Sequence, residues 1–321
     1  MAKPKILLTR PWPEGAQGWL QDRFDVTVHP GPGLDAAGLV QALRDYDALG
    51  VAVNDKMTQE VFAAPGPRAR LVANFGVGFE HIDVAAAKAA GIVVTNTPDV
   101  LTEATADIAL MLMLMASRRA GEGERQVRAG HWKGWGAKAL LGRSLQGKTL
   151  GLVGFGRIAQ ATARKAHGAL DMRVAYYGRR RAAPEIEAET GARYVSSLDD
   201  LAAEADVLSL HVPGGGDTHH LIDAVRLERM KPDAILINTA RGPVVDEAAL
   251  AQALRDGRIW AAGLDVYEHE PKVDPDLLAL DNVVLLPHLG SATVETREAM
   301  GMRATENIAL FFNGQPVRDA L

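Results

Sequence analysis

The stretch Lys148–Ala159 decides the fold and reads K-T-L-G-L-V-G-F-G-R-I-A. An apolar segment, Thr149–Val153, comes first, a glycine turn follows, and an amphipathic helical pattern begins after the turn. This order fits G-x-G-x-x-G/A, with Gly154, Gly156 and Ala159 at the small positions. The first glycine permits a tight turn, the second lets the backbone approach a pyrophosphate, and the small third residue lets helix and strand pack closely.

We therefore predict that a dinucleotide binds at this turn. Unpaired N–H groups and the dipole at a helix N-terminus favour an anion, so the pyrophosphate is expected beside Phe155, Arg157 and Ile158. An ordinary strand–helix turn is the alternative reading. The apolar strand before the turn and the amphipathic helix after it favour the dinucleotide.

The segment after the next strand predicts which dinucleotide binds. NAD-binding domains usually carry an Asp or Glu about 20 residues after the turn, which holds the ribose 2′-OH. Here the predicted strand Arg173–Tyr177 is followed by Gly178 and then Arg179, Arg180 and Arg181. The glycine leaves room, and arginines suit a 2′-phosphate in charge and geometry. We expect NADP(H) to be preferred and NAD(H) to be possible, although a short arginine run could also be a solvated loop.

Composition excludes several classes of protein. With 321 residues the chain is too long for one compact domain and suggests two. It has no cysteine, which excludes disulfides and thiolate metal sites, and its net charge of −5 gives no hint of a nucleic-acid surface. The start lacks the pattern of a signal peptide, and the longest apolar run, Ile108–Ala116, is far shorter than the about 20 residues of a membrane span. We expect a cytoplasmic protein that meets no membrane.

Short apolar runs alternate with helical patterns along the chain, which is typical of βαβ units and parallel sheets. We predict two Rossmann-like, doubly wound α/β domains with the active site in the cleft between them. A discontinuous substrate domain comprises 1–98 and 288–321, and a dinucleotide domain comprises 99–287 with a helix and arm at about 102–145. Long helices are expected at Thr102–Arg119 and Ser291–Asn313. The expected strands are Ile6–Thr9, Asp25–His29, Ala48–Val53, Leu71–Asn74, Ile92–Thr95, Thr149–Val153, Arg173–Tyr177, Val207–His211, Ala234–Asn238, Ala261–Val266 and Val283–Leu286.

Three polar residues follow predicted strands at the edge where doubly wound folds bind ligands: Arg241, Glu270 and His288. Taken singly, Arg241 could lie on the surface, Glu270 could be a solvated acid, and His288 could be a buried structural histidine. Taken together beside a dinucleotide, they supply what reduction of a carbonyl needs. A guanidinium can grip a carboxylate and polarise the adjacent carbonyl, a histidine can protonate the oxygen, and a carboxylate can orient the histidine.

Several motifs resemble the D-isomer-specific 2-hydroxyacid dehydrogenase family over nearly the whole chain, and within it the glyoxylate (hydroxypyruvate) reductases. They are Asn74–Gly78, Asn96–Leu101, Thr105–Asp107, the Gly154 turn, His211–Pro213, Thr239–Gly242, Asp265–Pro271 and Pro287-His288. The resemblance implies that Arg241 binds the substrate carboxylate, that His288 is the general acid in reduction, and that Glu270 rather than Glu268 pairs with it.

The resemblance also implies binding roles. Backbone groups of Val77 and Gly78 would hold the substrate carboxylate, with Asn54 and Leu101 near the substrate. Cofactor contacts are implied at Thr105, Gly154, Phe155, Gly156, Arg157, Ile158, Gly178, Arg179, Arg180, His211, Val212, Pro213, Thr218, Thr239, Ala240, Arg241, Asp265, His288 and Gly290. Two departures from the family pattern matter. Ala159 replaces a commoner glycine, and the glycines at 214–216 weaken the assignment of Thr218.

The family further implies a homodimer built by the helix after residue 100 and the arm that follows, where Trp132 and Trp135 either reach the partner's active site or only bury area at the contact. The expected activity is NADPH-dependent reduction of small 2-keto acids, glyoxylate or hydroxypyruvate, to 2-hydroxy acids. An NAD-dependent D-3-phosphoglycerate or other D-2-hydroxyacid dehydrogenase is the alternative within the family. A dinucleotide-sensing corepressor is the alternative from another class, because a fold alone does not fix a function.

Overall fold

The computed structural model describes residues 3–321, and these form two compact units. The first unit runs to Leu101 and resumes at Ala292–Leu321, and the second is Thr102–Ser291. The sequence placed the divisions at 98/99 and 287/288. His288 thus lies in the second unit, together with Arg241 and Glu270.

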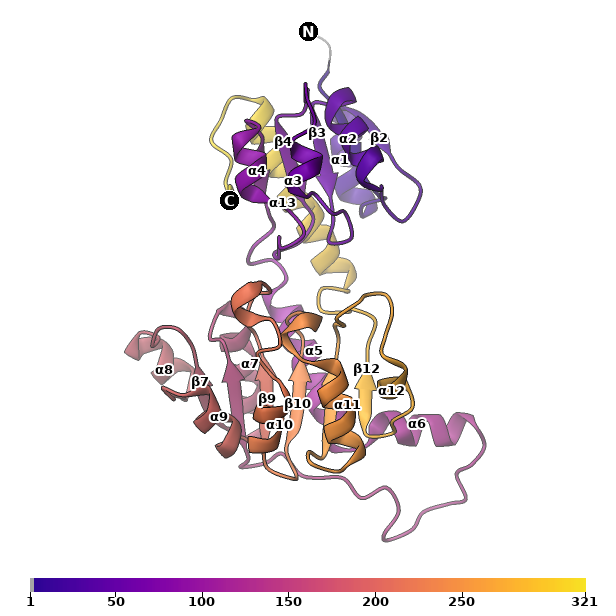
Figure 1. The fold of residues 1–321 in the computed structure, drawn as a ribbon, viewed down its shortest axis with the longest axis vertical. Helices are drawn as coiled ribbons and strands as arrows, with labels where there is room; N and C mark the ends of the chain where they lie inside the picture. Colours follow the sequence, from indigo (N-terminus) through magenta and orange to yellow (C-terminus); the bar gives the residue numbers. More distant parts are fainter. Residues whose placement is uncertain (1–2) are drawn as a thin grey trace. The chain divides into compact units, whose positions relative to one another are not determined.

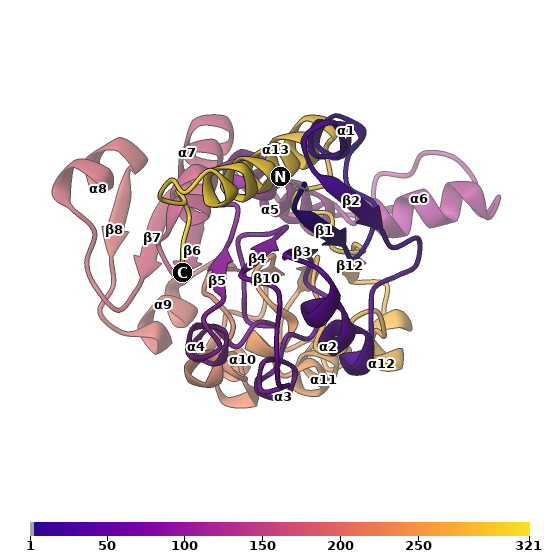
Figure 2. The ribbon, with the colours of Figure 1, turned by 90° about the horizontal axis from the view of Figure 1, so that it is seen from above.

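The first unit is built on a five-stranded parallel sheet, in the order β2 (Asp25–Val28), β1 (Lys5–Leu8), β3 (Ala48–Val51), β4 (Leu71–Asn74) and β5 (Val93–Thr95). One face packs against α1 (Glu14–Arg23) and α13 (Val294–Phe312), and the other against α2 (Ala36–Asp45), α3 (Gln59–Phe62) and α4 (Val84–Ala89) (Figures 1 and 2). The central strands are buried on both faces, as parallel strands with helices on either side must be.

The second unit is built on a seven-stranded parallel sheet, in the order β12 (Val283–Leu285), β11 (Ala261–Leu264), β10 (Ile235–Asn238), β9 (Val207–Leu210), β6 (Thr149–Val153), β7 (Arg173–Tyr177) and β8 (Ala192–Tyr194). On one face lie α5 (Thr102–Ser117) and α7 (Arg157–Leu170), and on the other α9 (Leu198–Glu204), α10 (Ala224–Arg229) and α11 (Glu247–Arg255) (Figure 2). The remaining helices are α6 (Ala120–Arg128), α8 (Pro184–Thr190) and α12 (Pro275–Leu278), with short 3₁₀ turns at Gly216–Thr218 and Gly242–Val244.

The predicted class, two doubly wound α/β domains with parallel sheets, is confirmed. The bounds of some elements differ. The helix expected to Arg119 ends at Ser117, because Arg119 adopts left-handed φ of 53° and α6 begins after it. The C-terminal helix begins at Val294, where the Thr293 side chain caps it. The strand expected to Val266 ends at Leu264, which places Asp265 just beyond the sheet.

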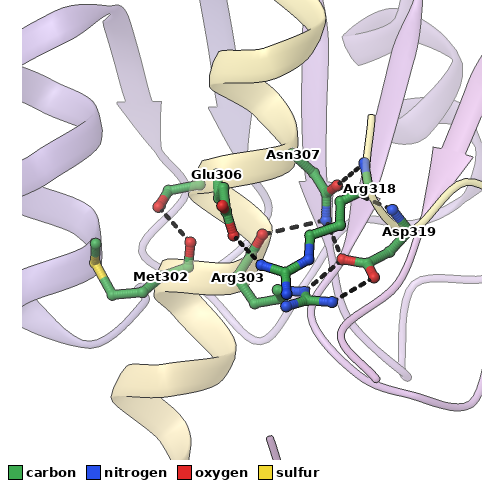
Figure 3. Close-up of polar contacts among 7 residues, drawn as sticks. Met302, Arg303, Glu306, Asn307, Arg318 and Asp319 are labelled. Carbon is green, nitrogen blue, oxygen red and sulfur yellow. Dashed lines mark hydrogen bonds and ion pairs between the residues drawn. The ribbon is translucent and has the colours of Figure 1, made fainter. Parts of the chain in front are cut away.

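The C-terminal segment is fastened to α13 by a buried ion pair (Figure 3). Arg303 donates from Nε and Nη2 to the two carboxylate oxygens of Asp319, at 2.6 and 2.7 Å. Asn307 donates to Asp319 at 2.9 Å and accepts from the backbone amide of Arg318. The Asp319 carbonyl in turn accepts from the amide of Asn96. No helix among residues 3–321 is long and apolar enough to cross a membrane.

Candidate active site

The glycine turn after β6 has the geometry that a pyrophosphate requires. Gly154 has φ of +89°, and a Cβ there would lie 2.8 Å from the His211 carbonyl oxygen, so only glycine fits. A Cβ on Gly156 would meet nothing within 4 Å, which leaves open space in front of the first turn of α7. Ala159 is fully buried. These residues fit a dinucleotide, because they provide a tight turn, an open approach and a close-packed helix.

The loop after β7 separates the three arginines. Arg181 makes a two-pronged ion pair with Glu187, at 2.9 and 2.7 Å, and Glu187 also accepts from the buried Tyr176 hydroxyl at 2.6 Å. The hydrogen bond from Arg181, followed by that from Tyr176, lowers the Glu187 pKa to about 2. Arg179 and Arg180 are exposed and make no ion pair within the described part of the chain. Two of the three guanidinium groups are therefore available to an anionic ligand.

The segment after β9 is anchored to its own sheet. The backbone amide of His211 donates to the Val153 carbonyl at 2.8 Å. Nε2 of the His211 ring lies 2.9 Å from the Ser209 hydroxyl. Burial lowers the His211 pKa to about 4, so the ring is neutral at neutral pH. The Thr218 hydroxyl donates to the Pro213 carbonyl at 2.8 Å, which folds the glycine loop back on itself.

Asp265 holds the loop that carries the histidine. This carboxylate is almost fully buried, and its two oxygens accept the backbone amides of Leu289 and Gly290 at 2.6 and 2.8 Å. Burial raises the Asp265 pKa, although these two hydrogen bonds oppose the shift. The Thr105 hydroxyl donates to the Gly290 carbonyl at 3.0 Å. Both side chains were expected to contact the cofactor, and the structure gives each a role in fixing residues 288–290.

His288 and Glu270 form a hydrogen-bonded pair, with Nδ1 2.9 Å from Oε2. The other Glu270 oxygen accepts the Tyr267 amide at 3.1 Å. Burial pushes the Glu270 pKa up, but the hydrogen bond and charge of His288 outweigh it, and the net pKa is lowered. His288 has φ of 56°, a conformation that a non-glycine residue adopts only when its surroundings impose it. Glu268 is directed elsewhere, to His220 at 2.8 Å.

Arg241 lies on the loop that follows β10. Asn238 fixes this loop by accepting the Ala240 amide at 3.0 Å and donating to the Arg241 carbonyl at 2.9 Å. A Cβ on Gly242 would lie 1.8 Å from the Tyr267 carbonyl carbon, so this glycine alone lets the Arg241 loop touch the loop that carries Glu270. The charge of Arg241 is among the causes that lower the Glu270 pKa. The buried Thr239 hydroxyl has no hydrogen-bond partner in residues 3–321, which suits a loop that a ligand completes.

In the first unit, two asparagine side chains hold the carbonyls of the loop after β4. Asn74 donates to the Gly76 and Gly78 carbonyls, at 3.0 and 2.8 Å, and Asn96 donates to the Val77 carbonyl at 2.8 Å. Neither the Val77 nor the Gly78 amide makes a hydrogen bond within the described residues. Leu101 is buried and Asn54 is exposed.

Sequence reasoning assigned no role to Asn74 or Asn96. The signal was present in the motifs N-F-G-V-G and N-T-P, which both begin with asparagine at a strand end. Only the folded structure shows that both side chains donate hydrogen bonds to the carbonyls of the loop after β4.

Comparisons with known proteins agree on the family. The family model described as the D-isomer specific 2-hydroxyacid dehydrogenase, NAD binding domain, matches residues 110–290. A glyoxylate reductase from Thermococcus onnurineus is 46% identical over 318 residues, which cover 98% of this chain and 94% of the relative. Among solved structures, the TT0316 protein from Thermus thermophilus has a TM-score of 0.91 at 43% identity, and covers 99% of each chain.

Another solved structure carries a bound cofactor. It is an NADPH-dependent glyoxylate/hydroxypyruvate reductase from Sinorhizobium meliloti, in complex with NADP and malonate, with a TM-score of 0.89 and 38% identity. The similarity covers 100% of this chain and 97% of that one. The matched family model and the full-length relatives lead to one assignment: this chain belongs to the D-isomer-specific 2-hydroxyacid dehydrogenases, the NAD(P)-dependent oxidoreductases that act on CH–OH groups.

Proposed function

We propose that this protein is an NADPH-preferring reductase of small 2-keto acids, glyoxylate and hydroxypyruvate first, and that it forms glycolate and D-glycerate. The observation that carries the proposal is the His288–Glu270 pair, with Nδ1 2.9 Å from Oε2. The loop that carries Glu270 packs against Gly242, which directly follows Arg241. Relatives named glyoxylate reductase support the choice of substrate. The open turn at Gly156 supports a dinucleotide.

A bound nicotinamide would supply the hydride to the keto carbon. This chain's residues would do the rest. Arg241 would hold the substrate carboxylate through paired hydrogen bonds and polarise the neighbouring carbonyl. The amides of Val77 and Gly78, which make no hydrogen bond within the described residues, would add donors to the same carboxylate.

The proton would come from His288. Its Nδ1 faces Glu270, so Nε2 is the atom left to face the substrate oxygen. Glu270 would hold the His288 ring in its orientation and stabilise the charged imidazole. The Glu270 pKa is lowered, so this carboxylate stays ionised. Asp265 and Thr105 hold the backbone that carries the ring, and so act as positioning residues rather than catalytic ones.

Arg179 and Arg180 support the preference for NADPH. They are exposed in the loop after β7, where Gly178 stands in place of a carboxylate. Of the three arginines, Arg181 is the one that Glu187 pairs with. Two arginines with no competing carboxylate can bind a 2′-phosphate through charge-assisted hydrogen bonds.

Steady-state turnover tests the proposal. Purified protein mixed with NADPH and glyoxylate, or with hydroxypyruvate, should lose absorbance at the reduced-nicotinamide band, and NADH should serve less well. A panel of other 2-keto acids is the control for substrate choice. Tight dinucleotide binding with no turnover on any 2-keto acid would contradict the proposal and favour a dinucleotide sensor.

We also propose a homodimer formed by α5 and the arm at about 102–145. The arm exposes large apolar side chains that a monomer would leave in water: Trp132 is 61% exposed, Trp135 88% and Leu141 58%. Burying them against a second copy removes that cost. Light scattering on a size-exclusion column should give twice the chain mass of 34.3 kDa, and Trp135→Ser should shift the protein toward the monomer.

A further inference from the structure

Two loops of the second unit bring together a cluster of side chains that the proposed chemistry does not use. His219 and His220 follow the glycine loop after β9, and Glu268 follows β11. His220 Nε2 lies 2.8 Å from Glu268 Oε1, and His219 Nε2 lies 4.0 Å from the same oxygen. One ligand atom from each of the three residues lies within 4.8 Å of the others.

We propose that His219, His220 and Glu268 form a binding site for a divalent transition-metal ion of the zinc type. Two imidazole nitrogens and one carboxylate oxygen are a donor set that zinc takes, at about 2.0–2.2 Å from the metal. Tetrahedral geometry at that radius separates neighbouring ligand atoms by about 3.3 Å. The separations of His219 Nε2 and His220 Nε2 from Glu268 Oε1, 4.0 and 2.8 Å, lie on either side of this value. The fourth position would belong to water.

A carboxylate that could support a ligating histidine lies near the ring of His220. Its other nitrogen, Nδ1, lies 4.0 Å from Asp246 Oδ2, and a ligating histidine almost always donates that second N–H to a carboxylate, carbonyl or water. The other Asp246 oxygen, Oδ1, accepts the Ala249 amide at the start of α11. That bond fixes the carboxylate, so a small turn of the His220 ring completes the contact.

His219 is the residue that must move most. Its ring stacks on His220 with centroids 4.0 Å apart, so the two rings must tilt before both nitrogens face one ion. The His219 side chain is 57% exposed, and among the described residues its only ion-pair contact is with Glu268. Gly215 precedes it at φ of +136°, in a loop where glycines leave the backbone free to adjust.

A bound ion would fasten the loop at 212–220 to the loop at 265–271. It would replace the present contact of His220 and Glu268, which joins the two loops through one hydrogen bond. The site is distinct from Arg241, Glu270 and His288. It therefore does not depend on the proposed reductase activity, and its test needs no turnover.

Calorimetric titration tests the site on the full-length chain, freed of metal with a chelator and carrying no histidine tag. Zinc should bind at one ion per chain with a dissociation constant in the micromolar range or below. Magnesium, which prefers oxygen ligands, should give no heat. His219→Ala should weaken zinc at least tenfold and leave the melting temperature of the metal-free protein unchanged, because this side chain is exposed.

His269→Ala is the matched control. It removes a histidine beside the same glutamate but outside the cluster, and zinc should bind it as it binds the unaltered protein. Glu268→Gln should lose affinity at least as severely as His219→Ala. Absence of zinc binding in the unaltered protein would overturn the proposal. Binding that survives in His219→Ala, or that falls equally in His269→Ala, would place the ion elsewhere and would overturn it too.

Discussion

Asp265 shows how one buried carboxylate can hold the loop that carries His288, the proposed general acid. Its two oxygens accept successive backbone amides, at Leu289 and Gly290, directly after His288. A carboxylate has acceptors only, so it satisfies both amides at once. The left-handed backbone of His288 is a conformation that such restraints can hold.

Asp265→Asn should therefore lower both stability and turnover. An asparagine has one acceptor oxygen, and its NH₂ group would face an N–H of the loop. The loss should be about 1–3 kcal/mol in the free energy of unfolding, measured by urea titration. Thr105→Val removes only the bond to the Gly290 carbonyl and should cost about 0.5–1.5 kcal/mol. If the Asp265→Asn protein were as stable and active as the unaltered one, the conformation of residues 288–290 would not depend on the Asp265 carboxylate.

Arg241→Ala should raise KM for the keto acid and lower kcat together, because in the proposed mechanism the same group anchors the carboxylate and polarises the carbonyl. Arg241→Lys keeps the charge but loses the two-pronged geometry, so it should recover part of the binding and little of kcat. Steady-state kinetics with glyoxylate measure both. An unchanged KM in Arg241→Ala would remove this residue from substrate binding.

At the scale of elements, the loop after β7 allows the cofactor preference to be tested arginine by arginine. Arg179→Ala combined with Arg180→Ala should weaken NADPH about tenfold or more and change NADH little, since charged hydrogen bonds contribute about 1.5–3 kcal/mol each. Arg181→Ala is the control, because Glu187 already holds that guanidinium. Fluorescence titration with both cofactors gives the ratio. Equal losses for NADPH and NADH would mean that the pair does not bind the 2′-phosphate.

Glu187 makes the same loop sensitive to acid. Its pKa is lowered from 4.5 to about 2 in the folded chain, so the ionised form stabilises the fold at any pH above the unfolded value. That contribution is lost as the pH falls from about 4.5 toward 2. Glu187→Gln should be less stable than the unaltered protein at pH 7, and the gap should narrow below about pH 4.5. Urea unfolding at a series of pH values measures the gap, and a gap independent of pH would contradict the assignment.

The strands were predictable because parallel strands are buried on both faces and appear in the sequence as short apolar runs. β8 was missed because Ala192–Tyr194 is a three-residue edge strand with an arginine at its centre. Several short helices were also missed, although two of their caps were visible: the side chains of Ser197 and Asp223 each accept a hydrogen bond at a helix start.

The candidate site was predictable in its residues but less so in its contacts. Arg241, Glu270 and His288 came from residue chemistry and a family resemblance. The Glu270–His288 pair spans 18 residues of sequence, and no local pattern encodes that approach. The clamp of Asp265 on residues 289 and 290 is likewise a contact between two strand ends, which depends on the order of β11 and β12 in the sheet.

At the scale of the whole molecule, the chain leaves the first unit at Leu101 and returns to it at Ala292. The first unit is thus completed by residues about 190 positions later in the sequence. Helix α13 covers one face of its sheet, and the segment after α13 reaches its edge strand. The stability of this unit depends on how well that late segment is fastened.

Asp319→Ala should show this dependence. It leaves the Arg303 guanidinium, which is only 13% exposed, without its carboxylate, and removing one partner of a buried pair costs about 3–5 kcal/mol. Chemical unfolding measures the loss. Replacing both partners, with Arg303→Met and Asp319→Leu, should cost less than Asp319→Ala alone. A single variant as stable as the double variant would show that the pair is not buried in solution.

The contacts of the last two residues, Ala320 and Leu321, limit where the protein can be attached to a surface. Ala320 pairs with Thr95, and the Leu321 amide donates to the Val94 carbonyl, so a linker fused after Leu321 would start inside a sheet edge. The sequence has no cysteine, and Glu185 on α8 is exposed. Glu185→Cys would therefore give one addressable thiol for immobilisation on an electrode or bead, and would leave the C-terminal edge intact.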